Sequence, residues 1–329
     1  MRVSLADLTA TARVVSVPLR VRFRGVEHRE ALLFEGPNGW AEWSPFLEYP
    51  DDEAAVWLAA AIEFAFGAAP TLVRDRIEVN ATLPAVSPSQ VEQVLAGFGK
   101  FRTVKIKVAE PGQGLQADLD RIAKVVSIWP NAKLRLDANG GFNVATAQLL
   151  ANACVENGWK LEYFEQPVAS VDQVAELRGL LAALGVLIAA DESVRKASDP
   201  LAVAKAQAAD LLVVKAAPLG GVSRALEIVQ EAGLPAVVSS ALETSVGLSM
   251  GLHLAGALEG EARAAGLGTA ALLAADVVED SLVARDGFIE VKRVVPSQSL
   301  LSRHEAIPER RDWWLQRLGR CLELLPGLL

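Results

Sequence analysis

The chain has 329 residues, of which 51% are hydrophobic and 22% charged, a composition typical of a globular protein with a sizeable core. Its net charge of −8 and lack of a basic run argue against a nucleic-acid or membrane partner. The N-terminus lacks the apolar core of a signal peptide, and two cysteines make no disulfide framework, so we expect a cytoplasmic protein. Whether it is a monomer or a homo-oligomer stays open.

The two ends of the chain are predicted to form a small α+β unit. Its first part consists of three β-like segments typical of an antiparallel meander: 12–25, 28–39 and 40–46. A helix is predicted over 51–68, and the tail returns to short β-like pieces and a Trp-rich helix. We therefore expect a capping domain over residues 1–76, completed by 276–329.

Residues 77–275 alternate short β-rich runs with helix-like stretches. The eight β-rich runs are 77–85, 102–108, 133–139, 161–167, 186–193, 211–217, 235–243 and 263–273. This alternation predicts a parallel sheet. Eight units, with no GxGxxG after the first strand, favour a (β/α)7β TIM-like barrel over the alternative, an open α/β sheet.

Charged residues end five of these otherwise apolar strands. They are Lys105, Lys107, Asp137, Glu165, Asp191 and Lys215, and from Lys107 onward they stand 24 to 30 residues apart, about one βα unit each. Singly, each carboxylate is explained by turn or helix-cap chemistry. Jointly they are hard to explain as packing, and strand ends of such barrels converge on one mouth. The pattern therefore predicts a single catalytic site.

The residue types point to metal-assisted proton transfer. Asp137, Glu165 and Asp191 offer the oxygen ligands that Mg²⁺ prefers. Lys105 and Lys107 lie two apart on one strand and project to the same face. At an effective dielectric near 20 their charges would repel by roughly 2.8 kcal/mol, which would lower a lysine pKa enough for it to act as a base.

These residues resemble the motifs of the muconate-lactonizing subgroup of the enolase superfamily, over nearly the whole chain. Arg135-Leu136-Asp137-Ala138-Asn139 and the segment Ser239–Gly247 are similar, more narrowly, to the o-succinylbenzoate synthase family, which belongs to the menaquinone pathway. A lysine base with Mg²⁺ stabilising an ene-diolate is the general chemistry of enolase-superfamily sites. Mn²⁺ is expected as a substitute metal.

The resemblance implies a dehydration of 2-succinyl-6-hydroxy-2,4-cyclohexadiene-1-carboxylate, a small carboxylate substrate, to o-succinylbenzoate. Lys107 would remove the proton α to the carboxylate and then help hydroxide to leave, while Lys215 stays protonated opposite. We expect Ser239 and Ser240 to bind the succinyl carboxylate. Arg135 and Asn139 complete the predicted substrate contacts.

Two other functions remain open. An N-acylamino acid racemase or dipeptide epimerase would use the same two lysines, although the Asp-x-Asp of dipeptide epimerases is missing from Gly266–Ala271. A non-catalytic barrel that acts as a binding protein is the alternative of another class.

Overall fold

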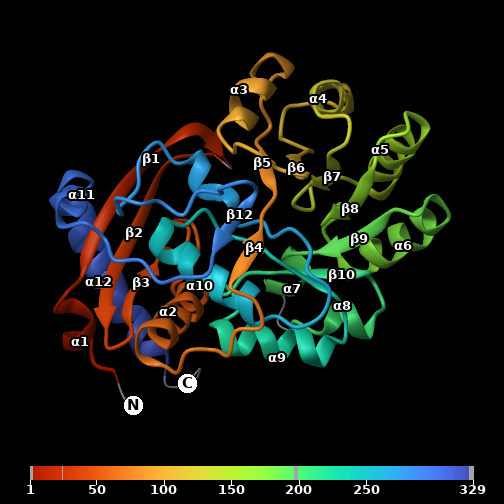
Figure 1. Ribbon diagram of the computed structural model, residues 1–329. Coiled ribbons are helices and arrows are strands. Elements are labelled where there is room, and N and C mark those ends of the chain that lie inside the picture. The colour runs from red at the N-terminus through yellow and green to blue at the C-terminus, as the bar shows by residue number, and fades with distance from the viewer. Residues whose placement is uncertain (1–2, 24, 196–198, 326–329) are drawn as a thin grey trace.

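The computed structural model describes residues 3–23, 25–195 and 199–325. Its centre is a sheet of seven parallel strands that neighbour one another in chain order (Figure 1). The strands are β5 (Ala81–Leu83), β6 (Thr103–Lys107), β7 (Lys133–Asp137), β8 (Leu161–Glu165), β9 (Leu187–Ala190), β10 (Leu211–Val214) and β11 (Ala236–Val238).

The two edges of this sheet are joined by a short eighth segment. Ala265 pairs in parallel with Val79, just before β5, and Gly266 pairs in parallel with Ser239, just after β11. The sheet is thus closed into the TIM-like barrel that the sequence predicts. The eighth strand is shorter than the predicted 263–273, because the chain turns into the 3₁₀ helix η3 (Gly268–Leu272) directly after the pairing.

Helices connect the strands and cover the outside of the barrel, as Figure 1 shows for α4, α5 and α6. The connecting helices are α3 (Val91–Ala96), α4 (Leu115–Ile128), α5 (Val144–Glu156), α6 (Val171–Leu181), α7 (Glu192–Arg195), α8 (Ala202–Lys205), α9 (Val222–Ala232) and α10 (Ser245–Ala257); short 3₁₀ turns are η1 (Pro88–Gln90) and η2 (Ala182–Leu184). Local chemistry explains their starts: Asn143 caps α5, and Ser170 forms a capping box with Gln173 at α6.

The remaining elements form the cap. They are α1 (Leu5–Thr9), β1 (Arg13–Phe23), β2 (Val26–Gly36), β3 (Gly39–Trp43), α2 (Asp51–Phe66), β4 (Arg76–Glu78), β12 (Phe288–Glu290), α11 (Gln298–Arg303) and α12 (Pro308–Leu324). Strands β1, β2 and β3 form the predicted antiparallel meander.

Both ends of the chain contribute to the cap. Helix α12 packs on α2, the rings of Trp43 and Trp314 meet edge to face at 5.2 Å, and β12 pairs antiparallel with β4. The division at residues 76 and 276 stays a prediction. Within the described residues no helix combines the length and hydropathy that a membrane crossing needs.

Candidate active site

The register of the sheet brings the predicted charged residues to one end of the barrel. Lys107 pairs with Asp137, which pairs with Glu165, so three successive strands end level with one another. Asp191 and Lys215 directly follow β9 and β10. All five are buried, with side chains that point into the barrel because every second residue of a strand faces the same side.

Most of these residues line one cavity of about 30 Å³. Its lining includes Lys105, Lys107, Asp137, Asn139, Asp191, Lys215, Ser239 and Ser240, together with Phe23 and Phe46 from the cap. Strands β6 and β10 lie on opposite sides of the closed barrel, so Lys107 and Lys215 face the cavity from opposite directions. A groove of about 990 Å³ reaches Lys107 and Asn139 from outside. Lys107 and Asn139 thus line both the cavity and the groove, whereas Lys215 lines the cavity and not the groove.

The two lysines of β6 have different partners. Lys107 Nζ donates to Asp137 Oδ2 and to Asn139 Oδ1, both at 2.6 Å. Lys105 Nζ lies 3.1 Å from Glu165 Oε1 and 3.2 Å from Asp137 Oδ2. Burial disfavours its charged form, but the two carboxylates outweigh burial, and the pKa of Lys105 is raised. The expectation that mutual repulsion lowers the lysine pKa is therefore wrong for Lys105.

The pKa values of the Asp137 and Glu165 carboxyl groups are shifted in opposite directions. Burial would raise the pKa of Asp137, but the ammonium groups of Lys107 and Lys105 hold it well below its usual range. Burial and the neighbouring Asp137 instead raise the pKa of Glu165. Negative charge at Glu165 is thus compensated less fully than at Asp137.

The Asp191 carboxylate lies between two cations. Its oxygens accept hydrogen bonds from Lys215 and, at 3.0 Å, from Arg195 Nε. Burial works against ionisation, yet these two cations lower the pKa of Asp191. Burial also lowers the pKa of Lys215 despite its contact with Asp191.

The donor set suits a hard divalent cation. Asp137, Glu165 and Asp191 supply buried oxygen donors, and a cation beside Glu165 would oppose the burial and the Asp137 charge that raise its pKa. Glu192 Oε2 is buried with no hydrogen-bond partner among the described residues. Lys105 forms ion pairs with the carboxylates of Asp137 and Glu165. In the described ranges, no three aspartate, glutamate, histidine or cysteine side chains are arranged around one point as metal ligands.

Further hydrogen bonds hold this site together, and two of the residues that make them, Gln166 and Arg195, were not singled out by the sequence analysis. Asn139, a predicted substrate contact, also donates to Glu192 at 3.1 Å. Gln166 Oε1 accepts from the backbone N–H of Asp191 at 3.1 Å, and Arg195 contacts Asp191 and the Tyr49 hydroxyl. The Asp191–Arg195 spacing of four on a helical turn was a usable signal. Gln166 had no comparable signal beyond its place after Glu165.

The predicted substrate contacts separate into two groups. Ser239 and Ser240 line the cavity, and the Ser240 hydroxyl lies 2.7 Å from that of Thr269. Arg135 lies outside the cavity lining: its guanidinium donates to Glu162 at 2.7 Å and to Asn80 Oδ1 at 2.9 Å. The structure thus brings the serines to the lysines but does not bring Arg135 to them.

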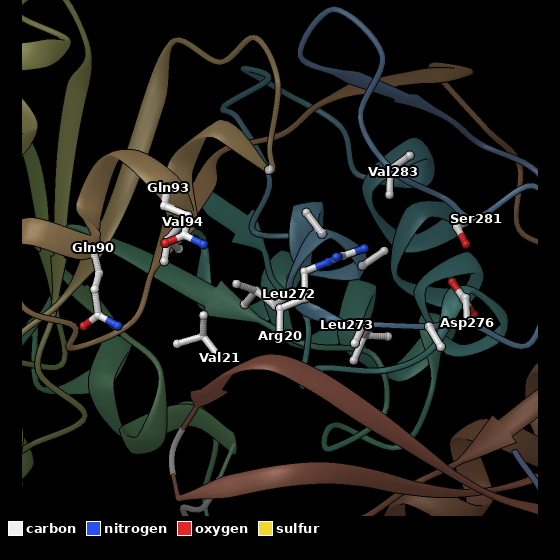
Figure 2. Close-up of a pocket in the computed structure, with 15 residues that line it drawn as sticks. Arg20, Val21, Gln90, Gln93, Val94, Leu272, Leu273, Asp276, Ser281 and Val283 are labelled. Carbon is white, nitrogen blue, oxygen red and sulfur yellow. The ribbon is translucent and has the colours of Figure 1, made fainter.

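A second large hollow lies beside the site. This crevice of about 950 Å³ runs between β1, α3 and the loop after η3. Figure 2 shows Gln90 and Gln93 on one side of it and Asp276 and Ser281 on the other. The Asp276 carboxylate is already bonded to the Ser245 backbone and hydroxyl, so the crevice offers no comparable set of acid–base groups.

Comparison with known proteins shows which family the chain resembles. The Enolase C-terminal domain-like family model matches residues 88–296, and the Enolase N-terminal domain-like model matches 14–65. The o-succinylbenzoate synthase of Mycobacterium marinum is 48% identical over 98% of this chain and 96% of its own length. That of Mycobacterium tuberculosis is 50% identical over 95% of this chain and 94% of its own.

Solved structures share the fold at lower identity. The muconate lactonizing enzyme of Pseudomonas fluorescens has a TM-score of 0.75 and 20% identity, covering 90% of this chain and 98% of that one. The L-Ala-D/L-Glu epimerase of Bacillus subtilis has a TM-score of 0.72 and 23% identity, covering 87% and 96%. The two domain matches and the close relatives show that the chain belongs to the o-succinylbenzoate synthase family of the enolase superfamily.

Proposed function

We propose that this protein dehydrates 2-succinyl-6-hydroxy-2,4-cyclohexadiene-1-carboxylate to o-succinylbenzoate in menaquinone biosynthesis. The observation that carries the proposal is the pair Lys107 and Lys215 on opposite sides of one cavity, above three buried carboxylates. The names of the relatives add the product, o-succinylbenzoate. We place the reaction in the cytoplasm, within a barrel over 77–275 and a cap from both chain ends.

Asp137, Glu165 and Asp191 would hold Mg²⁺, for which Mn²⁺ would substitute. When bound, the metal supplies positive charge where the substrate carboxylate becomes negative, which a carbon acid of this weakness requires. Charge balance supports this assignment. Three buried lysines face three buried carboxylates, and a dication offsets the two carboxylates of the substrate, so the charge of the loaded site changes only by the proton that Lys107 gives up before it acts as a base.

Lys107 carries both proton transfers. Its neutral amine takes the proton α to the ring carboxylate, and the electron pair of that C–H bond is delocalised onto this carboxylate as an ene-diolate, from which it returns to form the ring double bond as the hydroxyl leaves. The C–O bond to the hydroxyl then breaks, and the Lys107 ammonium returns a proton to the leaving oxygen, so that water departs. Asn139 and Asp137 orient the Lys107 side chain through their 2.6 Å hydrogen bonds.

The other groups stabilise charge and bind. Lys215 remains protonated on the opposite side and stabilises the developing anion. Lys105 stays charged between Glu165 and Asp137 and fixes both carboxylates. Ser239 and Ser240 bind the succinyl carboxylate. Among the described residues no histidine lines the cavity, and His253, on α10, is bonded through Nδ1 to Ser249 O at 2.7 Å.

The decisive experiment supplies the hydroxy-cyclohexadiene substrate and an N-succinylamino acid in parallel, each with Mg²⁺. We expect loss of the diene absorbance and little change in optical rotation. Racemisation of the N-succinylamino acid without loss of the diene would assign the protein to the racemase chemistry instead. Turnover of neither substrate, with or without metal, would favour a non-catalytic barrel.

A further inference from the structure

The loop between β11 and α10 carries a backbone conformation that needs support. Ser239, Ser240, Ala241 and Leu242 line the cavity on the side away from Lys107. Leu242 has φ +67°, a left-handed conformation that costs a non-glycine residue roughly 1 kcal/mol or more. Such a loop keeps its shape only where its surroundings hold it in place.

A carboxylate from the capping domain, that of Glu42, stabilises one end of this loop. Glu42, on β3, accepts hydrogen bonds from the backbone N–H of Thr244 and of Gly247, both at 3.1 Å, and from the Thr244 hydroxyl at 2.5 Å. Its other oxygen accepts from the Ser44 hydroxyl at 2.7 Å. These partners are all donors, which suits an ionised carboxylate, and two of them are N–H groups at the N-terminus of α10. Glu42 therefore caps α10 from another part of the fold.

Gly247 makes this approach possible. A Cβ at Gly247 would lie 2.6 Å from the Glu243 Cβ and 2.9 Å from the Glu42 Cδ, closer than side-chain carbons pack. The segment Ser239–Gly247 thus combines two roles. Its serines face the cavity, whereas the backbone N–H groups of Thr244 and Gly247 donate to Glu42 of the capping domain.

An arginine from the capping domain, Arg29, stabilises the middle of the same loop. Arg29, on β2, donates from Nε to Leu242 O at 3.2 Å and from Nη2 to Ala241 O at 3.4 Å. It also donates to Ser44 O, and its guanidinium lies 4.4 Å from the centre of the Phe46 ring, which lines the cavity. The side chains of Arg29 and Glu42 are buried, so water does not weaken these bonds.

We propose that Arg29 and Glu42 are positioning residues for substrate binding, which preorganise the 239–244 loop so that its serine hydroxyls and backbone bind the distal carboxylate of the substrate. The inference rests on the proposed function, because that function supplies the distal carboxylate. Neither residue touches the reacting atoms. The cap therefore contributes to specificity through the barrel loop, besides covering the cavity with Phe23 and Phe46.

A second cap carboxylate provides the matched control. Glu63, on α2, accepts from the backbone N–H of Val222 at 2.6 Å and of Ser223 at 3.0 Å, and so caps α9 in the same manner. Residues 216–221, which lead into α9, do not line the cavity. Loss of either carboxylate removes a helix cap and cap–barrel contacts, but only Glu42 supports the 239–244 loop.

The test compares two ligands in the Mg²⁺-loaded protein at pH 8. One is o-succinylbenzoate and the other is 2-butanoylbenzoate, which has a methyl group in place of the distal carboxylate. We expect Glu42→Ala to weaken o-succinylbenzoate binding by about tenfold or more, since several hydrogen bonds to a charged group disappear. The affinity of Glu42→Ala for 2-butanoylbenzoate should change less than about twofold. Glu63→Ala should change the affinity for each of the two ligands by no more than about twofold, while it lowers the melting temperature about as much as Glu42→Ala does.

Two further variants keep the test independent of folding. Glu42→Gln keeps one acceptor oxygen, so it should show the same ligand selectivity with a smaller loss even if Glu42→Ala is unstable. Ser240→Ala combined with Glu42→Gln should lose less than the sum of the single losses, because both act through one loop. In steady-state assays KM should rise while kcat stays within about threefold.

Equal losses for the two ligands, or the same selectivity in Glu63→Ala, would overturn the positioning role, since both would mark Glu42 as general domain support. Wild-type protein that fails to dehydrate the diene would overturn the proposed function, and this inference with it. If the wild-type protein dehydrates the diene but the Glu42 variants lose affinity equally for both ligands, this inference is overturned and the proposed function stands.

Discussion

Replacement of Lys107 tests the assignment of the base. Lys107→Ala removes the amine that carries both proton transfers, and a positioned acid–base group contributes roughly 10²–10⁴ to rate for one transfer. The structure offers no replacement on the same strand face. Lys105 Nζ is held at 3.1 Å from Glu165 and 3.2 Å from Asp137, and its pKa is raised, so it stays protonated. We therefore expect a loss on the order of 10⁴ or more, about 5 kcal/mol in the barrier.

Lys215→Arg gives the contrasting result. Guanidinium keeps the charge but cannot exchange protons at these pH values. It is also bulkier beside Asp191 and a small cavity, so we expect a loss of roughly 10- to 100-fold, which is smaller than that of Lys107→Arg. Initial rates from the diene absorbance, with Mg²⁺ saturating, measure both variants.

The control is the fold of each variant. In Lys107→Ala the Asp137 carboxylate keeps Lys105 at 3.2 Å, so thermal unfolding should stay within about 5 °C of the wild type. Solvent-deuterium exchange adds a second reading, since a two-base racemase would exchange the α-proton of one enantiomer when Lys215 is replaced. Equal, complete loss in both arginine variants, with such enantiomer-selective exchange, would refute the single-base dehydration.

Three other outcomes follow from the same structure. Asp191→Asn should lose Mg²⁺ affinity in calorimetry and all turnover while circular dichroism stays unchanged; Mg²⁺-dependent turnover at the wild-type rate would remove Asp191 from the ligand set. Burial raises the pKa of Glu42 from 4.5 to about 7, so the folded state holds this proton more tightly than the unfolded state does. Stability from Glu42 is then present below pH 4.5 and is lost as the pH rises to about 7, so wild type relative to Glu42→Gln should lose on the order of 3 kcal/mol across that window in urea unfolding. A stability difference that does not change with pH would contradict this. Burial raises the pKa of Cys154 to about 12 and that of Cys321 to about 11, so iodoacetamide at pH 8 should label neither in the native protein and both after denaturation, as mass spectrometry will show.

The chain of strands and the charged residues at their ends could be predicted from local pattern. Hydrophobic runs at β spacing alternate with helical stretches, and five of the eight runs end in a lysine or carboxylate. In a parallel barrel this suffices to bring Lys107, Asp137 and Glu165 level, because neighbouring strands run in register from the same edge. The recognised motifs then pointed to the family that the relatives show.

Other features depended on contacts that no local pattern encodes. Arg135 shares a strand face with Asp137, yet its guanidinium turns to Glu162 and Asn80, which only the closed barrel brings near. Lys105 was expected to lose proton affinity to a like-charged neighbour, but Glu165, 60 residues away, reverses the shift. The hydrogen bond from the Thr244 N–H to Glu42 joins residues 202 positions apart and connects the capping domain to the barrel. Sequence periodicity decides which way a side chain faces, whereas its partner, its charge state and its role are decided by elements distant in the chain that packing places beside it.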